Sequence, residues 1–211
     1  IFNKTSEDGS GDDSVGWNLY INSVGKAEFW HRTGAGGVHV VTVTSNDVLS
    51  DGSWHHVIIT ADRAGASPSD EGLLMYIDGN NVQTDKGDIS RRTQTINPNT
   101  SGDDAKLLIG MESADFDDEL GEFNGSIDEV AIFQNRILST PNVTAFYNNG
   151  APKDISAEAS LVGYWRFDEG TGTDVEDSSS HNNNGTLAND QMWGAGAGGT
   201  AVTKLEINSN V

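Results

Sequence analysis

Short runs of β-branched and aromatic residues recur along this chain, and turns rich in glycine, aspartate and asparagine separate them. Runs of about 4–8 residues between such turns are typical of all-β proteins. Because side chains alternate along a strand, each run can give one face to a shared core. The pattern therefore predicts an antiparallel two-sheet sandwich with strands at residues 17–22, 26–32, 38–44, 54–61, 73–78, 106–111, 126–133, 161–167 and 201–207.

One segment, residues 139–150, predicts a short helix instead. Thr140 can cap its N-terminus, Pro141 fits the first turn, and Gly150 can end the helix in a left-handed conformation. No repeat of fixed period is found, which argues against solenoids and propellers. We therefore expect an all-β domain with one short helix that packs on a sheet.

The charge balance excludes several classes of partner. The 211 residues include 12 Lys plus Arg and 32 Asp plus Glu, so the net charge is −20 at pH 7. Nucleic-acid binding needs a basic patch, and the only adjacent cations are Arg91 and Arg92. No run approaches the ~18 apolar residues of a membrane-spanning helix. We expect no nucleic-acid partner and no membrane insertion.

Three absences restrict the chemistry. The chain has no cysteine, which excludes disulfides, thiolate zinc sites and cysteine nucleophiles. Its five histidines form no His-x-x-x-His pair, and no Gly-x-Ser-x-Gly elbow supports a serine nucleophile.

Four motifs, in order, resemble the laminin G-like domains of the concanavalin A-like jelly-roll superfamily. They are Asp-Gly-Ser-Trp-His-His-Val at 51–57, Leu-Met-Tyr-Ile-Asp-Gly at 74–79, Leu-Leu-Ile-Gly at 107–110 and Phe-Asn-Gly-Ser-Ile-Asp-Glu-Val-Ala-Ile-Phe at 123–133. The resemblance covers residues 1–150 and implies a sandwich with ligand-binding loops at the rim of a concave sheet. It also implies that Trp54 lies in the core and that His55 or His56 bonds across the sheet.

Residues 151–211 resemble the block that usually opens such a domain, through the Tyr-Trp-Arg-Phe-Asp-Glu-Gly stretch at 164–170. Residues 1–150 are then a jelly roll without its usual opening strands, and residues 151–211 complete the same sandwich in permuted order. In that case we expect Trp165 and Phe167 to share a core with Ile127 and Ile132. The alternative is that this segment starts a second tandem copy.

The sequence also argues against glycoside hydrolysis. Sugar-cleaving members of the superfamily carry two carboxylates two residues apart on one strand, which places both on one face. No glutamate in this chain is followed by an aspartate two residues later. We therefore expect a non-enzymatic protein with no catalytic residues.

Calcium is the expected cofactor, because residues 112–119 offer five carboxylates and calcium prefers several hard oxygens from a flexible loop. Pentraxins, which resemble this domain in fold, place calcium ligands after the corresponding strand; Glu112 matches that pattern, whereas Ser113 and Ala114 do not. The alternative is a solvated acidic loop. A further aspartate at 128, which the family uses mostly for structure, completes the expected ligands: Glu112, Asp115, Asp117, Asp118 and Asp128.

Exposed tryptophans are the candidates for sugar stacking. Trp165 and Trp54 belong to motifs that pack inside in the resembling family. Trp30, beside His31 and Arg32, and Trp193, in a glycine-rich loop, are therefore the expected ligand-binding residues.

These features favour a structural or adhesion module on a virion or cell surface: a fibre, decoration or adhesin protein. Similar tails follow laminin G-like domains in fibre proteins of bacterial viruses. The chain opens at Ile1 without a leader pattern, so we expect it to be internal to something longer. Expected partners are other structural proteins of a particle or surface assembly, with glycans as further ligands and a homo-oligomer left open. The alternative function is a calcium-dependent carbohydrate-binding domain of a larger secreted enzyme or receptor.

Overall fold

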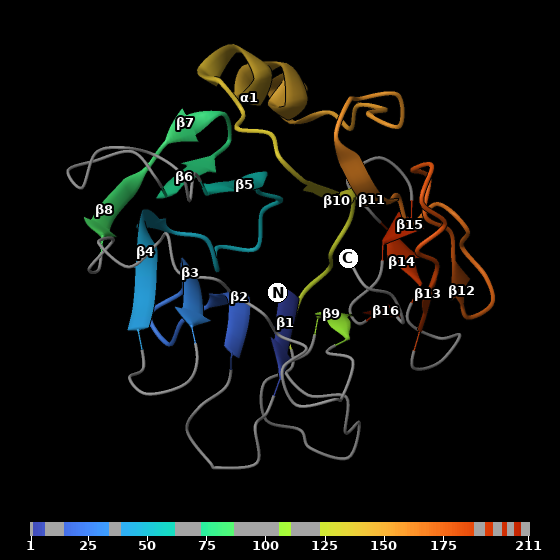
Figure 1. The fold of residues 1–211 in the computed structure, drawn as a ribbon, viewed down its shortest axis with the longest axis horizontal. Coiled ribbons are helices and arrows are strands. Elements are labelled where there is room, and N and C mark those ends of the chain that lie inside the picture. Colours follow the sequence, from blue (N-terminus) through green and yellow to red (C-terminus); the bar gives the residue numbers. More distant parts are fainter. Residues whose placement is uncertain are drawn as a thin grey trace. The chain divides into compact units, whose positions relative to one another are not determined.

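The computed structural model describes residues 2–6, 15–33, 39–61, 73–86, 106–110, 123–187, 193–195, 200–201 and 205–207. Within these ranges the chain is mostly β, with antiparallel sheets and one short α-helix, which confirms the predicted fold class (Figure 1). The chain divides into two compact units, one of residues 1–3, 106–136 and 151–211 and one of residues 4–105 and 137–150. None of the described helices is long and apolar enough to span a membrane.

In the unit of residues 4–105 and 137–150, four neighbouring strands form an antiparallel sheet, in the order β2 (Val15–Ile21), β3 (Lys26–Thr33), β4 (His39–Val48) and β8 (Gln83–Lys86). The register places Leu19 opposite Phe29 and Phe29 opposite Val43. Directly paired residues share a face, and Leu19 and Val43 are buried. This apolar face is the one that alternation predicts.

The turn between β2 and β3 forms a tight hairpin. Oδ1 of Asn22 accepts the backbone N–H groups of Val24 and Lys26, each over 3.1 Å. Gly25 has φ 80°, and a Cβ there would lie 2.1 Å from Oγ of Ser50. Only glycine fits this left-handed, crowded position.

The second sheet of this unit contains β5 (Val57–Ala61), β6 (Leu73–Ile77) and β7 (Asn80–Asn81). Strand β4 contacts β6. The core of this unit contains buried apolar residues of both sheets, among them Val41 and Val43 of β4 and Leu73, Met75 and Ile77 of β6. Between β6 and β7 the chain turns at Asp78 and Gly79, both with positive φ, as the Asp-Gly pair predicts.

The helix α1 (Thr140–Tyr147) belongs to the same unit and is followed by η2 (Asn148–Gly150). Its N-cap is Ser139, whose hydroxyl donates to Oδ1 of Asn142 over 2.8 Å, so the prediction of Thr140 as the cap is wrong by one residue. Asn148 ends the helix in the left-handed conformation, ahead of the expected Gly150.

In the other unit, β10 (Val130–Phe133) pairs antiparallel with β11 (Leu161–Trp165). A further ladder runs through β12 (Asp174–Val175), β13 (Gly185–Thr186), β16 (Leu205–Ile207), β9 (Leu107–Ile109) and the first residues of β1 (Phe2–Ser6). A small pair joins β14 (Gly194–Ala195) to β15 (Thr200–Ala201).

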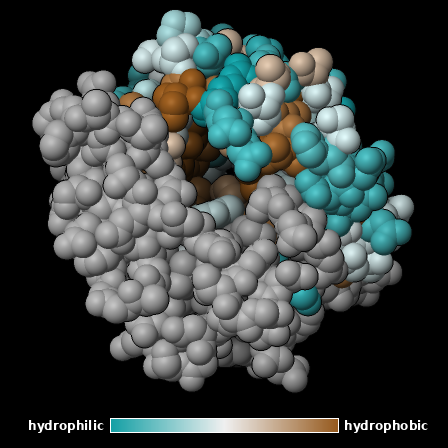
Figure 2. Space-filling model, viewed as in Figure 1, coloured by the Kyte–Doolittle hydropathy of each residue, from teal (hydrophilic) through white to brown (hydrophobic). Residues whose placement is uncertain are grey.

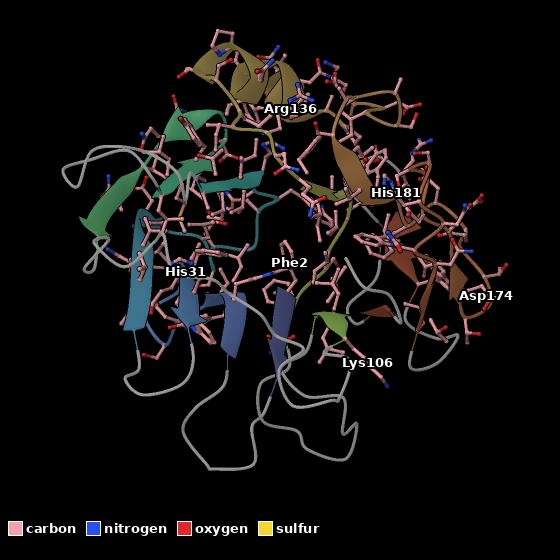
Figure 3. All side chains as sticks on the ribbon, in the orientation of Figure 1. Phe2, His31, Lys106, Arg136, Asp174 and His181 are labelled. Carbon is pink, nitrogen blue, oxygen red and sulfur yellow. The ribbon has the colours of Figure 1, made fainter. Side chains whose placement is uncertain are left out.

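The core of this unit contains large side chains with no exposed surface, among them Trp165, Tyr164, Phe167, Leu107 and Ile109. Ile127 is buried as expected, whereas Ile132 is partly exposed. Hydrophilic residues gather over the part that carries β12 and β13 (Figure 2), where Asp174 and His181 are exposed (Figure 3).

Several strands are shorter than predicted, for local reasons. The strand expected at 126–133 begins only at Val130, because Glu129 has φ 55°. The strand expected at 161–167 ends at Trp165, and Phe167 has φ 56°. Left-handed residues cannot continue a strand. In the range predicted as one strand at 201–207, the described residues belong to the separate strands β15 and β16.

Candidate binding face

The second face of β2, β3 and β4 carries polar and aromatic side chains. Trp30 lies opposite Asn18 on one side and Thr42 on the other, while Glu28 lies opposite Tyr20 and Thr44. Paired side chains on one face lie about 4.5–5.5 Å apart at Cβ. We call this set the polar face: Asn18, Tyr20, Glu28, Trp30, Thr42 and Thr44.

Trp30 occupies the middle strand of the polar face and is partly buried, as is Tyr20, whereas Asn18 is buried. The next residue, His31, lies opposite Trp17 and Val41 and is buried on the apolar side (Figure 3). The alternation therefore keeps the indole of Trp30 out of the apolar core.

The carboxylate of Glu28 is fixed by two neighbours on the same hairpin. The hydroxyl of Tyr20 donates a short hydrogen bond to Oε1, and Nδ2 of Asn22 donates to Oε2 over 3.2 Å. Each carboxylate oxygen has two lone pairs, so acceptor capacity remains on both. Glu28 is therefore an oriented acceptor beside Trp30.

The Trp-His-His motif lies in the same unit, ahead of β5. Trp54 is 45% exposed, so the expectation that it lies in the core is wrong. The strand starts only at Val57, and the backbone N–H of Ser53 donates to Oδ1 of Asp51 over 2.8 Å. Such a side-chain turn competes with strand pairing and leaves Trp54 on an exposed loop.

Both histidines of the motif contact the turn at Asp78. Nδ1 of His55 lies 2.9 Å from Oδ2 of Asp78, and Nε2 lies 3.2 Å from Oδ1 of Asp51. The backbone N–H of His56 donates to Oδ1 of Asp78 over 2.9 Å, and its ring lies 5.9 Å from that of Tyr147. The predicted bond across the sheet is thus made by His55.

The comparison with known families agrees with this architecture. Residues 1–144 of the 211 match the laminin G family model described as the concanavalin A-like lectin/glucanases superfamily. The chain belongs to this family. No curated protein and no solved structure matches it.

Trp193 is the other tryptophan expected to bind ligand in this laminin G-like chain. It belongs to the unit of residues 1–3, 106–136 and 151–211. Its Nε1 donates to the carbonyl oxygen of Gly172 over 2.8 Å, and the residue is partly exposed. The indole N–H of Trp193 is therefore already hydrogen-bonded within the protein, and the ring surface is the part that remains for stacking.

Of the expected calcium ligands, four lie outside the described residues: Glu112, Asp115, Asp117 and Asp118. Asp128 is described; it is partly buried, and its Oδ1 accepts the backbone N–H of Glu129 over 3.1 Å. Within the described ranges, no group of three or more His, Asp or Glu side chains could hold a metal. The calcium site, with Asp128 among its expected ligands, remains a prediction.

Sequence reasoning missed one pair of titratable side chains, Glu129 and Tyr164. The buried tyrosine donates a short hydrogen bond from its hydroxyl to Oε2 of Glu129. Burial raises the pKa of Glu129, although the hydrogen bond from Tyr164 opposes this, and burial together with Glu129 raises the pKa of Tyr164. Because the left-handed backbone of Glu129 sets this geometry, alternation along a predicted strand gave no signal of it.

Proposed function

We propose that this laminin G-like domain is a non-catalytic recognition module that binds neutral glycans through the polar face. The observation that carries the proposal is the register that aligns Trp30 with Asn18 and Thr42, next to the oriented carboxylate of Glu28. An indole ring stacks on the apolar face of a pyranose, while amide, hydroxyl and carboxylate groups orient its hydroxyls.

The charge of the domain favours neutral sugars. Glu28 contributes a carboxylate to the polar face, and the whole chain carries a net charge of −20. A sulfated or uronic acid sugar would be repelled by this field. The preferred ligands are therefore uncharged hexose or pentose chains.

A binding role fits the polar face better than hydrolysis. Retaining glycosidases use two carboxyl groups about 5–5.5 Å apart. Among the six residues of the polar face, Glu28 is the single acid, and Tyr20 and Asn22 hold both of its oxygens. The face can therefore orient a sugar but lacks a nucleophile and acid pair.

In its biological setting, the domain is a surface module of a virion or cell, acting as a fibre, decoration or adhesin protein beside other structural proteins. A chain with this acidic balance stays soluble and repels anionic surfaces. Quantitative analysis of purified particles tests this setting: stoichiometric copies per particle support it, and a free secreted monomer contradicts it.

Residues 151–211 complete the domain in this proposal. The antiparallel pairing of β10 with β11 and of β9 with β16 supports it, because both pairings join this segment to strands that precede residue 150.

An array of neutral and anionic glycans tests the binding function. Wild-type protein should bind neutral glycans, and Trp30→Ala should lose at least about tenfold in affinity, or ~1.4 kcal/mol. Asp174→Asn, at an exposed position outside the polar face, should bind as wild type. Each measurement is repeated in calcium and in chelator, because binding that needs calcium would indicate the alternative, a calcium-dependent carbohydrate-binding domain. Failure of wild type to bind neutral glycans in both conditions contradicts the proposal, and so does full binding by Trp30→Ala.

A further inference from the structure

Both ring nitrogens of His55 face carboxylates. Nδ1 lies 2.9 Å from Oδ2 of Asp78, and Nε2 lies 3.2 Å from Oδ1 of Asp51. A carboxylate is an acceptor only, and a neutral imidazole has a single N–H, whereas an imidazolium has two. Both bonds can therefore form only when His55 is charged.

The two carboxylates are held differently. Asp78 follows β6, and its other oxygen accepts the backbone N–H of His56, so it is fixed to the strand end. Asp51 has a side chain 49% exposed and lies on the exposed loop that carries Trp54. When His55 loses a proton, the shorter bond to Asp78 is the one expected to persist, and the Nε2 lone pair then faces the carboxylate of Asp51.

We propose that His55 is a pH-operated clamp, which ties the loop of residues 51–54 to the turn at Asp78 when charged and releases this loop, with the exposed Trp54, when neutral. The clamp lies within one unit and does not depend on glycan binding at the polar face.

The groups around the clamp favour the charged form of His55. Burial lowers the pKa of His55, but the hydrogen bonds and charges of Asp78 and Asp51 outweigh it and raise the pKa above the ordinary value. The neighbouring His56, which packs near Tyr147 of α1, has its pKa lowered by burial, against the attraction of Asp78. His56 is therefore expected to take up its proton at a lower pH than His55.

Nuclear magnetic resonance on the full chain tests the clamp. The ring nitrogen signals of His55 should titrate with a midpoint above about 6.5, the ordinary histidine pKa. The indole N–H signal of Trp54, assigned with Trp54→Phe, should shift with the same midpoint. His181→Gln is the matched control, because His181 is exposed in the other unit and its change should leave both curves unaltered.

Two variants separate the clamp from a general effect of pH. Asp51→Asn, on the exposed loop, should lower the midpoint of His55, and His55→Gln should abolish the pH-dependent shift of Trp54. A His55 midpoint at or below about 6.5, or a Trp54 signal that shifts equally in His55→Gln, overturns the proposal.

Discussion

The carboxylate of Asp177 accepts a hydrogen bond from the backbone N–H of Tyr164 over 2.9 Å, and Asp177 is buried, with 4% of its surface exposed. The same Oδ1 accepts the N–H of Ser179, and Oδ2 accepts the hydroxyl of Ser179 and the N–H of Asn183, each over 2.8 Å. Four donors thus satisfy a buried charge. The carbonyl of Asn183 in turn accepts the indole N–H of Trp165, so this loop binds β11 through the backbone of Tyr164 and the side chain of Trp165.

Removing the charge of Asp177 should destabilise the protein strongly. Asp177→Ala leaves buried backbone donors without acceptors, which costs about 1–3 kcal/mol per group, so we expect a loss of ~3 kcal/mol or more in the free energy of unfolding. Urea titration followed by tryptophan fluorescence measures it. Asp174→Asn, at an exposed position nearby in sequence, is the control and should change stability by less than ~0.5 kcal/mol.

Deleting residues 161–211 tests whether this segment belongs to the same domain. The deletion removes β11, the partner of β10, and leaves an apolar strand edge open to aggregation. We expect insoluble or molten protein, detected by solubility and by loss of a cooperative thermal transition. A cooperative, monomeric fragment would instead identify the tail as the start of another domain.

The sequence predicted the regular parts of this fold well, because alternation and turn residues are local signals. The expectation that Trp30 lies outside the apolar core agrees with its register on the opposite face. The sequence pattern failed where side chains redirect the backbone: the turn at Asp51 exposes Trp54, and left-handed conformations at Glu129 and Phe167 shorten two strands. At Glu129 the partner, Tyr164, is distant in sequence, so a local pattern carries no signal of their contact.

Loss of one hydroxyl from the polar face, that of Tyr20, should weaken glycan binding in part. Tyr20→Phe removes the donor to Oε1 of Glu28 but keeps the ring, so Glu28 is less well oriented. A lost hydrogen bond to a charged group is worth ~1.5–3 kcal/mol, and part of it should appear as weaker binding of neutral glycans, measured by calorimetry. Unchanged affinity in Tyr20→Phe would show that the hydrogen bond from Tyr20 to Glu28 takes no part in recognition.

The two histidines of the Trp-His-His motif should act on stability in opposite directions. His55 has a raised pKa in the folded state, so its contribution is present below about pH 6.5 and is lost as pH rises through the folded pKa. His56 has a lowered pKa, so its contribution is present above about pH 6.5 and is lost as pH falls through the folded pKa. Histidine titrates between about pH 5 and 8, and thermal melts across this interval measure the effect. In His55→Gln the loss of stability with rising pH should disappear, while the loss with falling pH should remain. A pH profile of Tm that is unchanged in His55→Gln contradicts this prediction.

Calcium should stabilise the protein if the acidic stretch at 112–119 binds it. Ligand binding to the folded state adds about 2.7 kcal/mol at a hundredfold excess over Kd, and ~1 kcal/mol raises Tm by ~2–4 °C in a chain of this size. Sodium at matched ionic strength controls for screening of the −20 charge. Asp117→Asn with Asp118→Asn should remove the calcium-specific rise and keep the salt effect, because these neutral amides are weaker ligands than carboxylates. Identical melting of the wild type in calcium and in chelator would leave the stretch as a solvated acidic loop.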